Sequence, residues 1–305
     1  MDSRHSLARL AAIVLNYGTP AYTLAAVASL RISQPRIDDL IIVDNDPDDE
    51  CRRALAVDPA VTYLSTEQNL GFSGGMNVGI RTALARGADA VLLVNSDATV
   101  PPDCLAHLVE ALESTADAGI AGPVLRSRSQ PDRIASMGMR YGPRSGRMRH
   151  HLAGTRHPSF ESQGIRRVDG VSGCVMLVTR RVFESIGLLE EDYFYSFEDL
   201  AFCLTARRAG FATVVAEMAT AYHEGGRTIG ADSPRRLYFA ARNHLLMATR
   251  HGSPGGLAAR WRVLSIVALN VAHAMIAPGA SFPVRLRAVA LGTRDYLNGR
   301  HGNDA

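Results

Sequence analysis

The stretch Val-Leu-Leu-Val-Asn-Ser-Asp-Ala, residues 91–98, decides how the chain is expected to fold. Its first four residues are apolar, and a short apolar run bounded by polar residues is typical of a strand buried on both faces. Asn95 and Asp97 follow where this strand would end. Ligands of open α/β sheets bind outside the carboxyl ends of strands, so a carboxylate here is well placed to hold a divalent metal or a sugar hydroxyl. The alternative is that Asp97 only caps the helix that begins near Pro101.

Strands and helices alternate on the amino-terminal side of this stretch. The expected order is a strand at 10–15, a helix at 22–30, a strand at 39–43, a helix at 50–56, a strand at 61–64 and a helix at 74–86. Such alternation predicts a parallel, doubly wound sheet with right-handed crossovers. The polar loops that follow the strands would then open along one edge of the sheet.

The second half of the chain is less regular. Residues 125–167 are rich in Arg, Ser, Gly, Pro and His and predict an irregular excursion that contains a hairpin at 139–150. The expected elements after it are a glycine-interrupted strand at 168–178, a helix at 180–186, a helix at 200–209, a strand at 211–215, a loop at 221–226 and a helix at 234–250. Two further helices, broken near Pro278 and Pro283, are expected between residues 257 and 298.

Composition excludes several classes of function. All 33 basic residues are arginine, which rules out lysine Schiff-base catalysis and favours guanidinium contacts to phosphate. The net charge of +3 is too small to indicate nucleic acid as a partner. The four cysteines form no C-x-x-C pair, and Cys104, Cys174 and Cys203 have apolar neighbours. Buried thiols in a reducing compartment are therefore expected, and with them a cytoplasmic location.

Acidic and imidazole side chains are expected at the same edge of the sheet as Asp97. These are Asp44, the pair Glu198 and Asp199, and His223. Any one of them alone would be interpreted as a solvated loop residue, but four at a common edge predict a site. The glycine-rich run at 69–79 opens a helix and suits close approach of backbone to a ligand, although its spacing does not fit a dinucleotide fingerprint.

The chain resembles the family 2 glycosyltransferases of bacteria, which have the GT-A fold, and in particular their rhamnosyltransferase-like branch. The matching motifs occur in the family's order and span roughly residues 10 to 250. They are Val14-Leu-Asn-Tyr17, Ile42-Val-Asp44-Asn45, Asn69-Leu-Gly-Phe-Ser-Gly-Gly-Met-Asn77, Leu92-Leu-Val-Asn-Ser-Asp97, Val171-Ser-Gly-Cys174, Tyr195-Ser-Phe-Glu-Asp199 and Ala221-Tyr-His223.

This resemblance implies a site for a nucleotide-diphospho-sugar donor. The residues expected to contact the base, ribose, diphosphate or sugar are Asn16, Tyr17, Asp44, Gly74, Gly75, Asn77, Asn95, Ser96, Asp97 and Arg227. Asn95-Ser96-Asp97 stands where the family has its D-x-D-like motif, so only Asp97 keeps the carboxylate that would meet Mg²⁺ or Mn²⁺ directly. For Arg227 a surface position is the competing interpretation.

The resemblance also implies the catalytic residues. Glu198 and Asp199 match the family's acidic pair, in which Asp199 would be the general base that deprotonates an acceptor hydroxyl. His223 would ligate the metal or bond the diphosphate, with a packed loop histidine as the alternative. Together these roles predict an inverting, metal-dependent glycosyltransferase. A nucleotidyltransferase and a non-catalytic nucleotide-sugar-binding protein are the competing hypotheses.

The expected organisation is a GT-A domain at 1–250 and a helical extension at 251–305. Within the domain, residues 1–124 would bind the nucleotide sugar and residues 125–250 would form the acceptor and catalytic half. The donor is expected to be dTDP-L-rhamnose or a UDP-sugar, and the acceptor a glycan, a lipid-linked sugar or a small molecule. The apolar segment 263–277 is flanked by arginines, which predicts peripheral contact with the inner face of the cytoplasmic membrane. A plain helix packed on the catalytic domain, or on the second subunit of a homodimer, is the equal alternative.

Overall fold

A mixed ten-stranded sheet runs through the larger part of the molecule. The computed structural model describes residues 7–56, 58–156, 164–224, 233–253 and 255–303. Across the sheet the strands follow in the order β10 (Ile165–Val168), β12 (Ala212–His223), β6 (Ala118–Ser127), β11 (Val175–Thr179), β4 (Ala90–Asn95), β1 (Leu10–Asn16), β2 (Asp39–Asp44) and β3 (Thr62–Ser65). Two short strands attach at the side, β5 (Ala98–Thr99) on β12 and β7 (Ile134–Ser136) on β6.

The predicted parallel sheet is confirmed for the first half of the chain. Strands β4, β1, β2 and β3 are all parallel, and Asn16 lies beside Asp44 at the end of the β1–β2 pair. Beyond β4 the directions change, because β11 is antiparallel to both β4 and β6, while β6 and β12 are parallel. The sheet is thus mostly parallel, and its carboxyl edge collects the residues that follow β1, β2 and β4.

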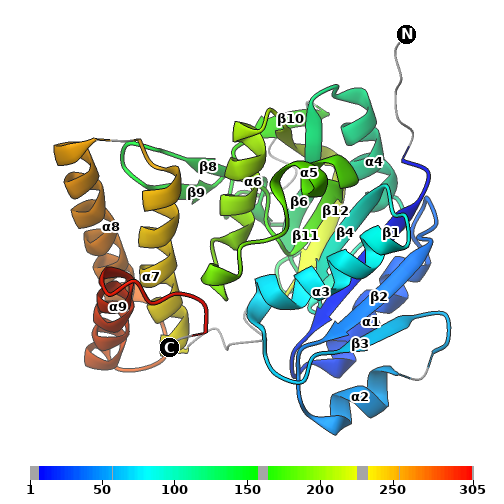
Figure 1. The fold of residues 1–305 in the computed structure, drawn as a ribbon, viewed down its shortest axis with the longest axis horizontal. Helices are drawn as coiled ribbons and strands as arrows, with labels where there is room; N and C mark the ends of the chain where they lie inside the picture. Colours follow the sequence, from blue (N-terminus) through cyan, green and yellow to red (C-terminus); the bar gives the residue numbers. More distant parts are fainter. Residues whose placement is uncertain (1–6, 57, 157–163, 225–232, 254, 304–305) are drawn as a thin grey trace.

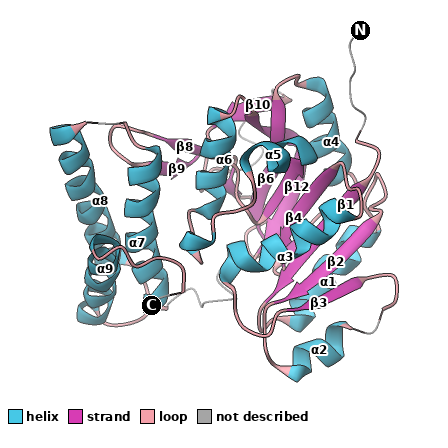
Figure 2. Ribbon diagram, viewed as in Figure 1, coloured by secondary structure: helices cyan, strands magenta, loops and turns pink. Residues whose placement is uncertain are grey.

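Helices cover both faces of the sheet, as Figure 2 shows. Side chains alternate along a strand, so Leu10, Ala12 and Val14 of β1 pack with α1 (Pro20–Arg31) and α4 (Cys104–Ser114). Ile13 points to the other face, toward α3 (Gly71–Ala85), which shares its layer with α5 (Arg180–Ile186) and α6 (Glu198–Arg208). The short α2 (Asp49–Leu55) lies between β2 and β3 in the chain.

Three helices form a separate body beside the sheet (Figure 1). They are α7 (Pro234–His251), α8 (Gly256–Ile276) and α9 (Phe282–Leu297). Helices α7 and α9 approach closely at Gly292, where a Cβ would collide with the carbonyl oxygen of Tyr238. The hairpin of β8 (Met139–Tyr141) and β9 (Met148–His150) reaches this body, and its Gly146 carbonyl bonds to His244 Nε2 at 2.7 Å. Among the described helices, none combines the length and hydropathy needed to cross a bilayer.

Two predicted elements need correction. The glycine-interrupted strand at 168–178 is two strands, β10 and β11, because the chain leaves the sheet edge after Val168 and re-enters beside β4. The loop predicted at 221–226 begins later than expected, since β12 continues to His223, which pairs with Ala98 of β5. Residues 225 and 226 of that loop lie outside the described residues.

Candidate active site

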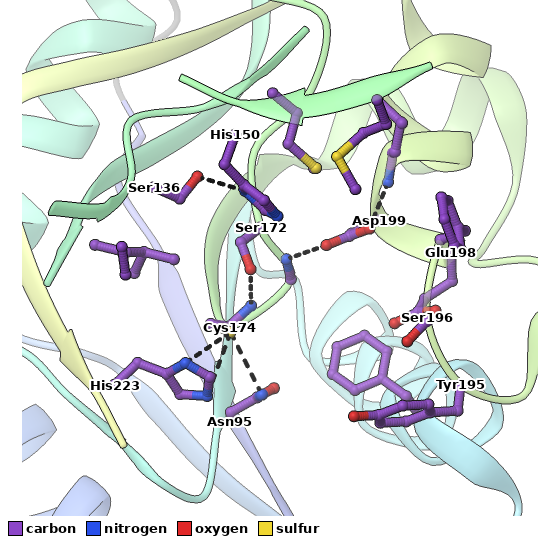
Figure 3. Close-up of a pocket in the computed structure, with 18 of the residues that line it drawn as sticks. Asn95, Ser136, His150, Ser172, Cys174, Tyr195, Ser196, Glu198, Asp199 and His223 are labelled. Atoms are coloured by element: carbon purple, nitrogen blue, oxygen red, sulfur yellow. Dashed lines mark hydrogen bonds between the residues drawn. The ribbon is translucent and has the colours of Figure 1, made fainter. Parts of the chain in front are cut away.

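A cavity of about 390 Å³ opens at the carboxyl edge of the sheet. It brings together five of the predicted site residues from three different segments of the chain, and Figure 3 labels Asn95, Glu198, Asp199 and His223 around it. These residues are Asn95, Asp97, Glu198, Asp199 and His223. The cavity therefore joins the predicted metal site to the predicted acidic pair, as the topology requires of residues at strand ends.

Asp97 and His223 form a buried pair at one side of this cavity. Asp97 Oδ1 lies 3.0 Å from His223 Nε2, and the Asp97 side chain is only 4% exposed. Burial alone would lower the pKa of His223, but Cys174 and Asp97 outweigh it and raise that pKa to about 11. The pairing depends on the strand contact between β12 and β5, which places His223 beside the turn that carries Asp97.

This pair could hold a divalent cation through the Asp97 carboxylate and, once the cation displaces its proton, through the His223 imidazole. Mg²⁺ is usually held by one or two carboxylates together with substrate phosphates, without a cage made wholly of protein. Asn95 Oδ1 is buried at the same cavity and has no hydrogen-bond partner among the described residues, which leaves an oxygen free for a ligand. Within the described part of the chain, no cluster of three or more His, Cys, Asp or Glu side chains could hold a metal alone. Phosphate oxygens and water would have to supply the other ligands.

Cys174 is not the buried structural thiol that its apolar neighbours predicted. It is partly exposed and lines the cavity, where its Sγ lies 3.5 Å from His223 Nε2 and 3.6 Å from Asn95 Nδ2. Cys104 and Cys203 are buried, as predicted. The short run before β11 places Cys174 opposite Asn95 at the end of β4, a proximity that depends on sheet pairing and not on local sequence.

A second, smaller cavity of about 80 Å³ adjoins the first. It contains Tyr17 and Ser96, two of the predicted donor-binding residues, and it shares Asn95 with the larger cavity. The Ser96 hydroxyl lies 2.9 Å from the hydroxyl of Thr19, which connects the turn after β4 to the start of α1. Two adjoining cavities that share Asn95 suit an elongated ligand.

Asn16 and Asp44 lie beneath the smaller cavity and do not line either one. Both are fully buried, and Asn16 Nδ2 donates to Asp44 Oδ1 at 2.7 Å. The other Asp44 oxygen accepts from the Tyr63 hydroxyl at 2.5 Å. In this structure the two residues fix the ends of β1 and β2, and their contact with a donor stays a prediction.

The glycine-rich run forms the first turns of α3. Gly71 lines the smaller cavity with a positive φ of 72°, and a Cβ there would be 2.5 Å from the carbonyl oxygen of Phe194. Gly75 packs against Leu15. Asn77 donates to the Leu189 carbonyl at 2.9 Å and accepts from the Leu189 N–H at 3.1 Å. Gly74, Gly75 and Asn77 therefore support the helix behind the cavities without lining them.

The turn that presents the acidic pair has an unusual backbone. Phe194, Ser196 and Phe197 have φ values of 55°, 69° and 73°, a region that non-glycine residues rarely adopt. Such conformations cost about 1–3 kcal/mol each and persist only where surrounding contacts enforce them. The turn ends directly at Glu198 and Asp199, the first residues of α6.

Arg242 and Asn243 of α7 supply those enforcing contacts. Asn243 Nδ2 donates to the carbonyl oxygens of Tyr193 and Tyr195 at 2.6 Å each and of Ser196 at 3.1 Å. Arg242 Nε donates to Asn243 Oδ1 at 3.0 Å, which orients the amide. Both side chains are fully buried. We refer to these two residues as the α7 clamp.

The two carboxyl groups of the pair have different surroundings. Asp199 accepts from the backbone N–H groups of Gly173 at 3.0 Å and Leu200 at 2.7 Å, which stabilise its charged form against the burial that raises its pKa. Glu198 Oε2 is buried without a partner among the described residues. Burial, and then the charge of Asp199, raise the Glu198 pKa to about 8. Glu198 thus keeps its proton at neutral pH beside the carboxylate that can act as a base.

The raised pKa of Glu198 predicts a pH dependence of stability. Between its unfolded pKa of 4.5 and about 8, the folded state holds a proton that the unfolded state has lost. The free energy of unfolding should therefore fall as pH rises through this window, with a contribution of about 1.4 kcal/mol per pH unit from a single group. Glu198→Gln should remove this contribution in urea unfolding measured from pH 5 to 9. Glu110→Gln on the exposed face of α4 is the control, and an equal change in both variants would contradict the assignment.

Sequence reasoning missed His150 and Ser136, which also line the larger cavity. His150 Nδ1 lies 2.9 Å from the Ser136 hydroxyl, and the histidine is carried into the site by the β8–β9 hairpin (Figure 3). The hairpin itself was predicted, so a polar side chain on its returning strand was the available signal. Arg227, predicted as a phosphate clamp, lies outside the described residues.

The fold is of the GT-A type, as its likeness to the solved structures described below shows. The chain belongs to the family described as glycosyltransferase like family 2, which matches residues 8–245. The predicted family and fold class are confirmed. The family match ends within α7, so α8 and α9 lie beyond it.

Relatives with assigned names are enzymes that transfer sugars. A dTDP-rhamnosyl transferase of Shigella flexneri, RfbF, is 24% identical over 75% of this chain and 76% of its own length. An N-acetylglucosaminyl-diphospho-decaprenol L-rhamnosyltransferase of Mycobacterium tuberculosis is 25% identical over 88% of this chain and 92% of its own length. The hexosyltransferase Agl10 of Haloferax volcanii is 28% identical, and the match spans 61% of this chain and 58% of that protein.

Solved structures with similar folds include two with nucleotide ligands. The mannosyltransferase PcManGT of Pyrobaculum calidifontis, in complex with GDP-Man and Mn²⁺, has a TM-score of 0.57 at 15% identity and covers 95% of this chain and 87% of its own. GalNAc-T7 with UDP, GalNAc and Mn²⁺ has a TM-score of 0.60 at 12% identity and covers 97% of this chain and 58% of its own. At these identities the likeness establishes the fold.

Proposed function

We propose that the protein is an inverting, metal-dependent glycosyltransferase that uses a nucleotide-diphospho-sugar donor. The observation that carries this proposal is the placement of Asp199 and the Asp97–His223 pair around one cavity. A base and a candidate cation site in the same cavity are what displacement at an anomeric carbon needs. The smaller adjoining cavity, with Tyr17 and Ser96, is the proposed place of the nucleotide.

In the proposed reaction, Asp199 accepts the proton of an acceptor hydroxyl. The acceptor oxygen forms a bond to the anomeric carbon as the bond from that carbon to the diphosphate oxygen breaks. The bonding electrons leave with the nucleoside diphosphate, and a single displacement inverts the anomeric configuration. The backbone N–H groups of Gly173 and Leu200 hold the Asp199 carboxylate in place for this transfer.

Asp97 and His223 are the residues proposed to hold Mg²⁺ or Mn²⁺. When bound, the cation would neutralise the charge that develops on the departing diphosphate. Asn95, which borders both cavities, would contact ribose or sugar, and the fully buried Asn16 and Asp44 would shape the floor of the nucleotide subsite. Gly74, Gly75 and Asn77 would support this floor through α3.

The proposed donor is dTDP-L-rhamnose, with UDP-sugars as the second choice. The printed names of the Shigella and mycobacterial relatives support a rhamnosyl donor. The mycobacterial name also supports a lipid-linked acceptor, ahead of a free glycan or a small molecule.

A donor screen tests the proposal. Incubation with Mn²⁺ and a panel of nucleotide sugars should release nucleoside diphosphate slowly even without acceptor, and fastest with the true donor. Tight donor binding without release from any donor would favour a non-catalytic binding protein. Formation of a nucleotide sugar from a nucleoside triphosphate and a sugar phosphate would favour a nucleotidyltransferase.

We also propose that the outer face of α8 contacts the membrane surface on its cytoplasmic side. Exposed apolar side chains of α8 gather on this face at Leu257, Trp261, Leu264 and Met275. The sequence from 233 to 294 contains nine arginines and no acidic residue, and the exposed ones among them, such as Arg260 of α8 and Arg287 of α9, complement anionic lipid headgroups. Packing of a second copy on the same face is the competing interpretation.

Leu264→Asp should weaken binding to phosphatidylglycerol vesicles about tenfold, because the variant loses the burial of a leucine and adds a charge that anionic lipid repels. Ile32→Asp is a matched control, since both residues are 59% exposed and Ile32 lies at the end of α1. Sedimentation is measured in parallel. A dimer that Leu264→Asp converts to monomers, with vesicle binding unchanged, would identify the face as a subunit interface.

A further inference from the structure

A groove between α7 and α9 lies apart from the two cavities described above. Its volume is about 470 Å³. Tyr238, Phe239, Val284, Ala288 and Leu291 give it an apolar lining, while Arg235, Arg287, Arg294 and Arg300 supply positive charge. Among the described residues that line it, Asp295 is the single acidic one. The groove therefore combines an apolar surface with an excess of guanidinium groups.

The four arginines that line the groove differ in whether they form an ion pair with a carboxylate. Arg294 donates to Asp295 Oδ1 through Nε at 3.1 Å and Nη2 at 3.0 Å, and Arg300 Nη1 lies 3.8 Å from the same oxygen. Within the described ranges, Arg287 and Arg235 have no acidic partner at salt-bridge distance. Arg235 instead lies over the Phe239 ring, at 5.9 Å from its centroid. Two guanidinium groups thus remain available to an anion, and guanidinium is well suited to phosphate.

The start of α7 connects this groove to the active site. Phe239, which lines the groove, stacks on Phe194 with ring centroids 5.3 Å apart and meets the edge of Tyr195 at 6.1 Å. Phe194 and Tyr195 line the smaller cavity, and Tyr195 also lines the larger one. Arg236 faces the larger cavity while its neighbour Arg235 faces the groove. A substrate long enough to extend along the start of α7 could occupy the larger cavity and the groove at the same time.

From this arrangement we infer that the α7–α9 groove binds the phosphate-bearing lipid part of the acceptor, an amphiphile whose diphosphate meets Arg287 and Arg235 and whose chain lies along Tyr238 and Leu291. The inference rests on the proposed function, because it assigns the groove to the acceptor of that reaction. Charge complementarity decides the occupant: a neutral glycan would leave the guanidinium groups unused, and a soluble sugar phosphate would leave the apolar lining exposed.

Binding is measured without donor, so that it does not depend on turnover. Farnesyl diphosphate, below its aggregation concentration and in EDTA, is the probe for head and chain together, and inorganic diphosphate is the probe for the head alone. Calorimetric titration of the full chain should give at least tenfold tighter binding for farnesyl diphosphate. Arg287→Glu should weaken that binding tenfold or more. Arg260→Glu, the same charge reversal at an exposed site on α8, should change it less than twofold.

A second variant, Leu291→Trp, tests the part of the groove that is inferred to bind the lipid chain. The larger side chain fills the groove without altering its charge. It should weaken farnesyl diphosphate binding and leave binding of inorganic diphosphate unchanged, with thermal unfolding as the check on folding. Equal affinity for both probes, or equal losses in Arg287→Glu and Arg260→Glu, would overturn the inference. The inference would also be overturned if Arg287→Glu lost binding to phosphatidylglycerol vesicles but kept its binding to farnesyl diphosphate. Arg287 would then contact the membrane surface and not the acceptor. If the protein bound farnesyl diphosphate more tightly than inorganic diphosphate but turned over no donor, the groove would still be a site for an amphiphilic diphosphate. The proposed glycosyltransferase activity would then be wrong.

Discussion

Asp199→Asn is expected to lower the rate of sugar transfer by about 10²- to 10⁴-fold, the usual contribution of a positioned general base. The amide keeps the size of the carboxyl group and can still accept from the Gly173 N–H, although it loses the bond from the Leu200 N–H. The contacts from Asn243 remain, so the turn before α6 should persist. Donor affinity should stay within about twofold of the unsubstituted protein, because Asp199 acts on the acceptor hydroxyl. Transfer is followed by release of nucleoside diphosphate in the presence of acceptor, and donor affinity by calorimetry.

Asp117→Asn is the matched control for this loss. Asp117 is an exposed aspartate that forms an ion pair with Arg167, away from both cavities, and the same substitution there should leave transfer unchanged. Normal transfer by Asp199→Asn would make the base assignment wrong. Glu198, the other member of the acidic pair, would then be the next carboxyl group to test.

Asp97→Asn is expected to abolish the metal-dependent part of donor binding. Loss of a carboxylate ligand should cost about 3 kcal/mol, which corresponds to roughly a 100-fold weaker donor affinity in Mn²⁺. In EDTA the variant and the unsubstituted protein should bind donor alike, because no cation is then present for Asp97 to hold. The measurement is a pair of donor titrations for each protein, with Mn²⁺ and with EDTA.

The two variants serve as controls for each other. Asp199→Asn should keep the Mn²⁺ enhancement of donor binding that Asp97→Asn loses. An Mn²⁺ enhancement that survives in Asp97→Asn would remove this residue from the metal site, and the same titration on His223→Ala would show whether the imidazole is the main ligand.

Local sequence was sufficient to predict the parallel half of the sheet and the position of Asp97. The apolar runs of β1, β2 and β4 are long enough to identify, and the first polar residue after each marks the sheet edge. Local sequence could not predict that β11 enters antiparallel beside β4, because strand order depends on contacts distant in the chain. The misinterpretation of Cys174 follows from the same cause.

The donor-binding predictions met a different difficulty. Asn16 and Asp44 do lie at strand ends, but their polar atoms form hydrogen bonds to each other and to Tyr63. The sequence motifs do not reveal these hydrogen bonds. The turn before Glu198 was equally inaccessible, since Phe194, Ser196 and Phe197 give no hint of left-handed backbone. Its conformation is imposed by Asn243, almost fifty residues further along the chain.

The α7 clamp makes the turn before α6 depend on residues beyond α9. Arg242 Nη1 donates to the carbonyl of Gly302 at 2.9 Å, so the chain beyond α9 is bonded to the residue that orients Asn243. Shortening the chain after α7 would remove this anchor and uncover the side of the helix on which α9 packs. In purified fragments that end near residue 250, the turn before α6 would then be held less firmly. Weak activity of such fragments would say little about the activity of the intact enzyme.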